Sequence, residues 1–446
     1  MRLDTLLYIY LRHCTSLWCS YFRTMTDSRK FACMFIGDLL SHDENERTRL
    51  NPPFVAMNNV CGRTSLATVL PILPIEIIDN VCQRLDICDL ANLVRANRVL
   101  NVVGIRRLYH TIGIEIRPAR LLQCMTSLDH SADLPLLVRT FEVNLVNNLP
   151  TRTYYLLLER ILKKMVNLTT LVVELPKHHS PTWALPMPPP PTASSESPSQ
   201  IFRLHSFTTS MHCKSSLARF LDSQPEITEL TLRGINSDLE NPFLTTLLHS
   251  MGTLPPDHPL AVFLDPQPSQ FILLPTSIPK LSHFNAVHAG PTVIRNVISS
   301  RPVTHISIPI LSSQTMDTLS ALSSSSKPLV KLTVMSFDPA ALQFLFPELS
   351  VRFMELESLN IVALMAEVTA TMLLQWGVYL AGFKKMKYIT FMATLEGDGD
   401  GGEEIDEKKI AQVWHSSCPT LRTVILPHGK VWFEATTTDD KKSDRE

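Results

Sequence analysis

Residues 281–308, LSHFNAVHAGPTVIRNVISSRPVTHISI, contain the pattern that decides the fold. An apolar triplet, Leu281-Phe284-Ala286, is followed by a segment of helical periodicity at 291–300 and by a second triplet, Val303-Ile306-Ile308. In an extended strand, the second and third residues of each triplet lie two apart and project from the same face. The stretch therefore predicts a strand, a helix and another strand that share one core.

The same triplet, with apolar residues at positions i, i+3 and i+5, recurs along the chain. The other triplets are Val138-Phe141-Val143, Leu168-Leu171-Val173, Leu204-Phe207, Ile227-Leu230-Leu232, Leu329-Leu332-Val334, Leu356-Leu359-Ile361, Met386-Ile389-Phe391 and Leu421-Val424-Leu426. The last six triplets begin 22, 26, 27, 30 and 35 residues apart. Further helices are expected between triplets, at 151–165, 215–223, 241–250, 314–323 and after Asp338-Pro339. Each unit would bury its apolar face only against its neighbours.

This spacing resembles that of leucine-rich repeats, in which an LxxLxL signature recurs about every 20–29 residues. The resemblance implies an α/β fold, with parallel strands on one face of a solenoid and helices on the other. The Asn or Cys that usually follows the triplet is not regularly present. We therefore expect an irregular leucine-rich-repeat solenoid, and the alternative is an unrelated α/β fold.

A different pattern occupies residues 72–112, ILPIEIIDNVCQRLDICDLANLVRANRVLNVVGIRRLYHTI, which predict three short helices. Pro74 suits a first helical turn, where its missing N–H costs nothing. An apolar stripe at helical spacing follows, formed by Ile77, Ile78, Val81 and Leu85. Asp86 and Asp89 then form a plausible capped start for a second helix. Three helices in about 40 residues make only a small core.

This segment resembles the F-box. The matching elements, in order, are Leu73-Pro74, Glu76, Ile77-Ile78, Leu85-Asp86-Ile87-Cys88-Asp89-Leu90 and Leu108-Tyr109. Two positions depart mildly from the family pattern: Tyr109 stands where Trp is frequent, and Asn97 falls near a position often filled by Val or Cys. A closing stretch, Trp414…Cys418-Pro419-Thr420-Leu421-Arg422…Trp432, is similar to the end of the repeat array in many fungal F-box proteins.

The resemblance implies binding to the Skp-type adaptor of cullin-RING ubiquitin ligases and, through it, to cullin. The adaptor-facing surface would comprise Leu73, Pro74, Ile77, Ile78, Val81, Leu85 and Leu90. Some of these side chains could instead only pack inside the three-helix unit, and for Val81 and Leu90 both interpretations stay open. Leu73 and Pro74 lie at an entry turn outside the helical stripe, which favours an interface.

Four regions are expected along the chain. They are an irregular N-terminal extension at 1–65, the F-box at 66–116, a leucine-rich-repeat-like domain for substrate or partner binding at 117–434, and a disordered charged tail at 435–446. The repeat domain contains a Pro-rich insertion at 176–198. The window 359–383 is the most membrane-like, but it divides into a strand and a buried helix, so no membrane contact is expected.

Composition argues against several functional classes. The 446 residues include 41 basic and 42 acidic side chains, which give a net charge of −1 and rule out nucleic-acid binding through bulk charge. With only 14 glycines, phosphate-cradling loops are not expected, and no cofactor motif occurs. The nine cysteines contain no CxxC pair, which predicts reduced, mostly buried thiols in a cytoplasmic or nuclear protein. The loop 396–407 approaches a calcium-binding pattern, but Glu396 and Glu403 occupy unsuitable positions, which favours an acidic surface loop.

The resemblance to the F-box and to leucine-rich repeats thus implies a non-catalytic substrate-recognition subunit of an SCF-type ubiquitin ligase, which holds a protein target through its repeats. An interaction scaffold that binds the adaptor without delivering a target is the alternative. A hydrolase or transferase is a third class, and it would require a closed pocket with converging polar groups.

Overall fold

The computed structural model describes residues 74–96, 98–113, 118–145, 152–176, 185–186, 202–234, 271–336, 339–395 and 406–433. These residues form an α/β fold with an open, mostly parallel sheet, in which the strands follow the sequence order from β1 to β12. The chain divides into two compact units, Met1–Glu142 and Val143–Glu446. Several expectations lie outside the described residues: the extension at 1–65, Leu73, nearly all of the Pro-rich insertion, the helix at 241–250, the loop at 396–405 and the tail at 435–446.

The first unit is mainly helical in its described part. Its elements are α3 (Ile75–Arg84), α4 (Ile87–Ala96), α5 (Arg98–Leu108), β1 (Thr111–Ile112), α6 (Pro118–His130) and α7 (Leu134–Leu137). The first three helices occupy the positions that the sequence predicts. Strand β1 pairs in parallel with the start of β2 (Thr140–Asn144) through Thr111↔Thr140 and Ile112↔Phe141.

Local chemistry sets the boundaries of these helices. Pro74 precedes α3 with φ −49° and ψ 141°, and extended backbone at Leu85 ends the helix. The side chain of Asp86 accepts a hydrogen bond of 2.9 Å from the backbone N–H of Asp89, as expected for a residue that caps α4. The side-chain amide of Asn101 on α5 donates to the carbonyl of Val94 at the end of α4. These contacts set the ends of α3 and the start of α4, and they join α4 to α5.

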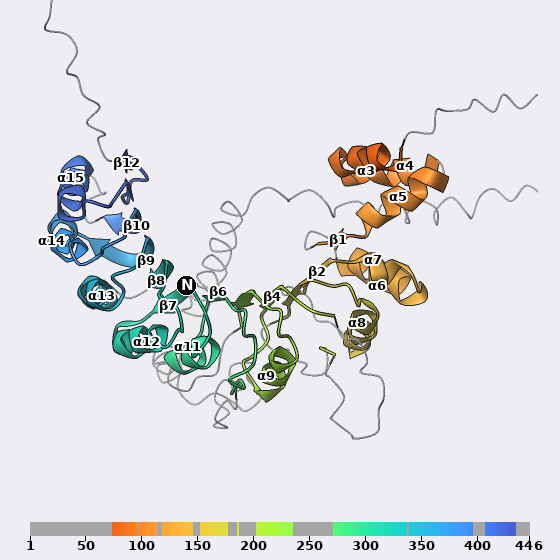
Figure 1. Ribbon diagram of the computed structural model, residues 1–446, viewed down its shortest axis with the longest axis horizontal. Coiled ribbons are helices and arrows are strands. Elements are labelled where there is room, and N and C mark those ends of the chain that lie inside the picture. The colour runs from red at the N-terminus through yellow and green to blue at the C-terminus, as the bar shows by residue number, and fades with distance from the viewer. Residues whose placement is uncertain are drawn as a thin grey trace, which may run out of the picture. The chain divides into compact units, whose positions relative to one another are not determined.

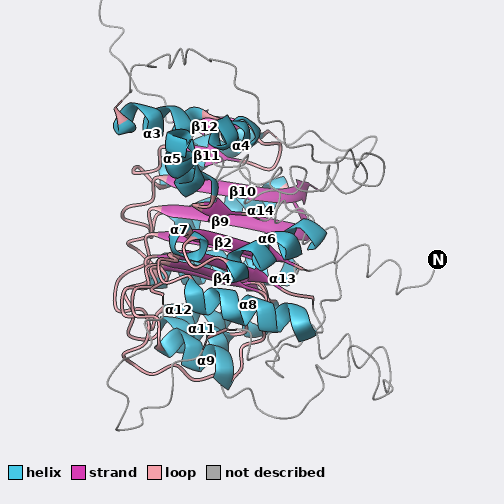
Figure 2. Cartoon of the chain, turned by 90° about the vertical axis from the view of Figure 1, so that its right-hand side faces the viewer, coloured by secondary structure: helices cyan, strands magenta, loops and turns pink. Residues whose placement is uncertain are grey.

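The second unit alternates strands and helices. Its elements are α8 (Arg152–Lys164), β3 (Thr170–Glu174), β4 (Ser206–Thr209), α9 (Ser215–Asp222), β5 (Glu229–Leu232), β6 (His283–Ala286), α11 (Pro291–Ile298), β7 (His305–Ile310), the 3-10 helix η2 (Ser312–Gln314), α12 (Thr315–Leu322), β8 (Lys331–Ser336), α13 (Pro339–Arg352), β9 (Ser358–Val368), α14 (Ala370–Leu380), β10 (Tyr388–Leu395), α15 (Glu407–Ser417), β11 (Thr423–Ile425) and β12 (Val431–Phe433). In this unit the strands lie side by side, with α9 and α11–α15 along one face (Figures 1 and 2).

The apolar triplets form the core of this layer. Each of the ten predicted triplets coincides with one strand from β2 to β11, and their second residues are in direct register across β3–β11, from Leu171↔Phe207 to Ile389↔Val424. All of these side chains are buried. The terminal strand β12 pairs antiparallel with β11, so the sheet is mostly rather than wholly parallel. Within the described residues, no helix is both long and apolar enough to cross a membrane.

Candidate functional site

The predicted adaptor-binding residues divide between two environments in the first unit. Pro74, Ile77 and Val81 are exposed, and the isoleucine and valine retain 48% and 47% of their accessible surface. Their spacing of three and four residues places them on one side of the helix entry and of α3. We call these three residues the α3 stripe. They form an apolar strip that the helical unit does not cover.

The remaining predicted residues face or approach the core of the same unit. Ile78 and Leu90 keep only 8% and 3% of their surface and pack with Cys82, Val94 and other apolar side chains. Leu85 is partly buried against that cluster. For Leu90 the structure thus shows the packing role that the sequence left open, and for Val81 it shows an exposed side chain. Leu73 lies outside the described residues.

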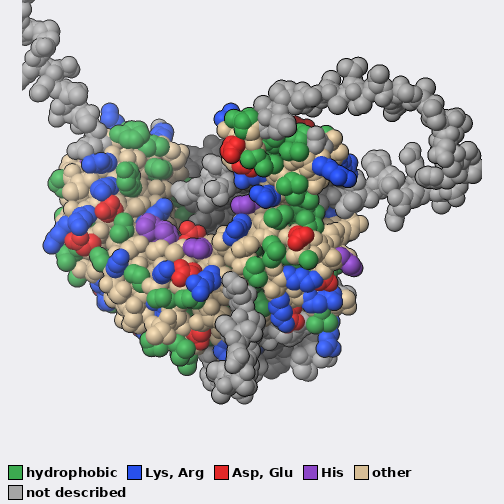
Figure 3. Space-filling model, turned by 45° about the vertical axis from the view of Figure 1, so that its right-hand side comes forward, with side chains coloured by type: hydrophobic (Ala, Val, Ile, Leu, Met, Phe, Trp, Pro, Cys, Tyr) green, Lys and Arg blue, Asp and Glu red, His purple; other side chains and the backbone are tan. Residues whose placement is uncertain are grey.

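Within α3–α5, three exposed apolar residues were not predicted as site residues. Ile75 begins α3, and Val99 and Val102 lie three residues apart on α5. The valines show the same helical spacing as Ile77 and Val81, whereas Val103 on the same helix is buried. Hydrophobic side chains are visible among charged ones on the helical unit in Figure 3.

The second unit offers the surface expected to hold a target. In each strand, residues that alternate with the buried triplet positions project from the face opposite the helices. We call this surface the inner strand face. Histidine side chains lie near acidic and basic ones on the second unit in Figure 3. On the inner strand face, the paired positions of β5–β8 hold Glu229, His283, His305 and Lys331, so this face is mixed in charge.

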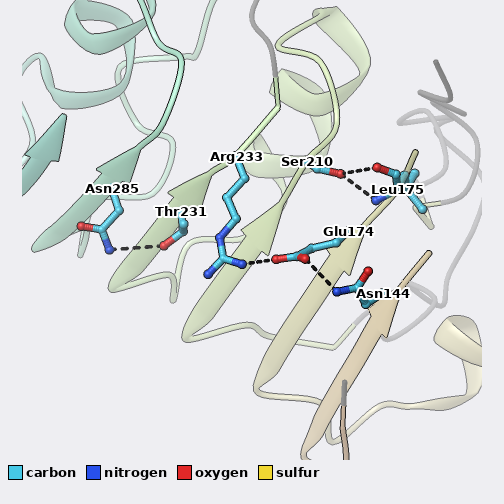
Figure 4. A network of polar contacts seen from close by, with 7 residues as sticks. All are labelled: Asn144, Glu174, Leu175, Ser210, Thr231, Arg233 and Asn285. Carbon is cyan, nitrogen blue, oxygen red and sulfur yellow. Dashed lines mark hydrogen bonds and ion pairs between the residues drawn. The ribbon is translucent and has the colours of Figure 1, made fainter. Parts of the chain in front are cut away.

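One end of the inner strand face carries a closed polar network (Figure 4). Glu174, at the end of β3, is nearly buried and forms an ion pair with Arg233, just after β5. The side-chain amide of Asn144 on β2 donates to the other carboxylate oxygen over 3.1 Å. The hydroxyl of Ser210 accepts a hydrogen bond from the backbone N–H of Leu175 and donates one to the backbone carbonyl of the same residue. Because both carboxylate oxygens of Glu174 have partners, this network positions strand ends rather than offering a free charge.

Further along the same face, His283 and His305 stack across β6 and β7 with ring centroids 4.3 Å apart. The Nδ1 atoms lie 2.9 Å from the hydroxyls of Ser282 and Thr304. The same hydroxyls of Ser282 and Thr304 also lie 3.2 Å and 3.4 Å from the backbone carbonyl oxygens of Thr228 and Ser282. Burial, with the nearby charges of His283 and Lys331, lowers the pKa of His305 below its ordinary value.

Other chemistry in the described part of the chain is limited. Cys82, Cys124, Cys213 and Cys418 are buried, as expected, and none of these four forms a disulfide. Among the described residues, no group of three or more His, Cys, Asp or Glu side chains could hold a metal ion.

Comparison with known proteins adds no assignment. No family model matches the chain, and no curated protein is significantly similar to it. Functional inference therefore depends on the residues and surfaces of this chain.

Proposed function

We propose that the chain is the substrate-recognition subunit of an SCF-type cullin-RING ubiquitin ligase. The helices α3–α5 would bind the Skp-type adaptor and, through it, cullin, and the inner strand face would hold a protein target. Two observations support the proposal: the F-box-like motif at 72–112 and the arrangement of the side chains of that motif in the structure.

The observation that carries this proposal is the α3 stripe. The three-helix unit buries Ile78, Cys82 and Leu90 in a core of its own, yet leaves Pro74, Ile77 and Val81 in solvent. Adjacent exposed apolar side chains on one helix favour a protein–protein contact over a role in folding. The stripe also coincides with the leading Pro and Ile positions of the F-box-like pattern.

The proposed mechanism is proximity. A receptor that binds adaptor and target together raises the effective concentration of the target near the ubiquitin-charged enzyme. The chain itself would supply binding energy and orientation, and the transfer chemistry would occur on its partners. On this basis the protein is a non-catalytic member of the ligase complex.

Binding to a purified Skp-type adaptor tests the proposal. We expect the full chain to bind it and the double variant Ile77→Ser/Val81→Ser to lose about 2 kcal/mol, or roughly 30-fold in affinity, because two central apolar contacts are removed. Since both side chains are half-exposed, the variant should fold normally.

A matched control is Phe344→Ser/Val351→Ser, which removes two exposed apolar side chains from α13 in the second unit. This variant should bind the adaptor like the wild type. Failure of the wild-type chain to bind, or equal binding by the α3 variant, would refute the proposed function.

A further inference from the structure

A continuous row of uncharged polar side chains crosses seven neighbouring strands of the inner strand face. The members, in directly paired positions from β4 to β10, are Thr208, Thr231, Asn285, Ser307, Thr333, Asn360 and Thr390. Each lies between two buried residues of its strand, so its side chain projects away from the helices. We call this set the polar row.

Two pairs within the polar row are already hydrogen-bonded. The side-chain Nδ2 of Asn285 donates to Oγ1 of Thr231, and Nδ2 of Asn360 donates to Oγ1 of Thr333, both over 3.3 Å. Figure 4 shows the first pair, whose side chains meet between β5 and β6. Each asparagine has a second amide hydrogen and a carbonyl oxygen, and each threonine has its own hydroxyl hydrogen. The row therefore presents both donors and acceptors without any formal charge.

Between the two pairs lies Ser307, whose hydroxyl is the unusual member. The residue keeps 4% of its accessible surface, and its Oγ has no hydrogen-bond partner among the residues that the structure describes. Buried hydroxyls in native proteins are nearly always paired, because an unpaired one loses its hydration without replacement. A polar group brought by a partner would supply the missing bond.

The two flanks of the polar row differ from each other. On one side, Pro309, Met335, Val362 and Met392 occupy paired positions of β7–β10 and form an apolar strip. On the other side, the paired positions of β5–β8 hold Glu229, His283, His305 and Lys331, a set of mixed charge. An occupant of the polar row would thus contact aliphatic surface along one edge.

We propose that the polar row binds an uncharged, extended polypeptide segment of the target; this inference rests on the proposed function in assigning that segment to a ligase target. Peptide N–H and C=O groups and side-chain amides offer donors and acceptors in turn, as the polar row does. Aliphatic side chains of the segment would pack on the strip from Pro309 to Met392. A carboxylate, phosphate or ammonium group placed on the polar row would be desolvated without an opposite charge among its seven members.

Selection from synthetic peptide libraries tests this inference on the full chain. Three immobilised dodecapeptide libraries serve as probes: one of Ser, Thr, Asn, Gln, Ala, Val and Leu, and two in which alternate positions are fixed as Glu or as Lys. We expect preferential retention on the uncharged library. The selected peptides should bind about tenfold more weakly to Thr333→Glu, which places a charge in the row.

Two further variants separate recognition from folding. Thr371→Glu places the same charge at an exposed position of α14 and should bind the selected peptides like the wild type. Ser307→Ala should weaken peptide binding about fivefold while leaving the melting temperature unchanged or higher, because it removes an unpaired buried hydroxyl. A purely structural role for Ser307 predicts no change in peptide affinity.

Preference for the Glu or Lys library, retention on none, or unchanged affinity in Thr333→Glu would overturn the inference. Adaptor affinity measured on the same preparations keeps the two proposals distinguishable. Normal adaptor binding without peptide selectivity refutes the polar row alone, whereas peptide selectivity without adaptor binding refutes the proposed function alone.

Discussion

At the scale of single residues, the side chain of Arg301 places a charged guanidinium group beside the core of the second unit. Only 2% of its surface is accessible. Its guanidinium donates to the backbone carbonyls of Leu274, Ser277, Asn296, Val297 and Ser299. Three of these carbonyls lie at the end of α11 or directly after it, so the side chain caps that helix and joins it to the preceding segment. Burial lowers the pKa of Arg301, and the nearby charge of Asp222 opposes this shift.

Replacing Arg301 should therefore be costly. We expect Arg301→Ala to lower the free energy of unfolding by about 3 kcal/mol or more, since several buried carbonyls lose a charged donor. The free energy of unfolding of Arg301→Lys should lie between those of the wild type and the alanine variant. An ammonium group cannot bind the carbonyls in the fork geometry of a guanidinium. Urea denaturation measures the difference. A loss below about 1 kcal/mol for the alanine variant would contradict this account.

The stacked pair His283 and His305 predicts a pH dependence. The folded-state pKa of His305 lies below its ordinary value of 6.5, so the folded chain takes up this proton less readily than the unfolded chain. The contribution of neutral His305 to the stability of the fold is therefore fully present above pH 6.5, and it is lost as the pH falls through the folded-state pKa. His305→Asn should reduce the acid-side loss of melting temperature. An unchanged pH profile in that variant would contradict the role of His305.

At the scale of elements, α3 shows where helical periodicity is informative and where it is ambiguous. The sequence grouped Ile77, Ile78, Val81 and Leu85 into one apolar stripe. In the structure, Ile78 faces the core, whereas Ile77 and Val81 are exposed. A broad stripe identifies the helix, but which of its edges is buried depends on how α4 and α5 pack against it. Spacing alone could not decide this.

The contact between α4 and α5 depends on Gly104. A Cβ atom at this position would lie 2.5 Å from Cγ1 of Val94 and 3.3 Å from Cδ1 of Leu90. The valine is β-branched and cannot easily rotate away. We expect Gly104→Ala to destabilise the three-helix unit by about 1–3 kcal/mol and to weaken adaptor binding with it. Thermal unfolding of the full chain, followed by adaptor titration, checks both; a variant as stable as the wild type would show that the helices pack more loosely.

At the scale of the whole chain, the repeated triplets predicted the strands well because each repeat uses the same short-range rule. Ten triplets correspond to β2–β11, and the buried second positions form one register. The end strands were missed. Strand β1 has two residues and β12 has three, without a triplet, and each exists only because a neighbouring strand edge is available to it. Such pairing depends on tertiary context.

The surfaces were less predictable than the strands. Seven adaptor-facing residues were named from the sequence, and of these Pro74, Ile77 and Val81 are exposed. The polar row was not foreseen, because neighbouring members of the row are separated by up to 54 positions in the chain and meet only through strand register. Its chemistry follows from Ser, Thr and Asn residues that look unremarkable within each repeat.

Amide hydrogen exchange of the full chain, with and without a purified Skp-type adaptor, tests adaptor binding by α3–α5 most directly. We expect the adaptor to slow exchange in α3 and the neighbouring α4 and α5, and to leave exchange in β4–β10 unchanged. Protection from exchange that is confined to the second unit would contradict the proposed function. So would the absence of any protection at adaptor concentrations that saturate other receptors.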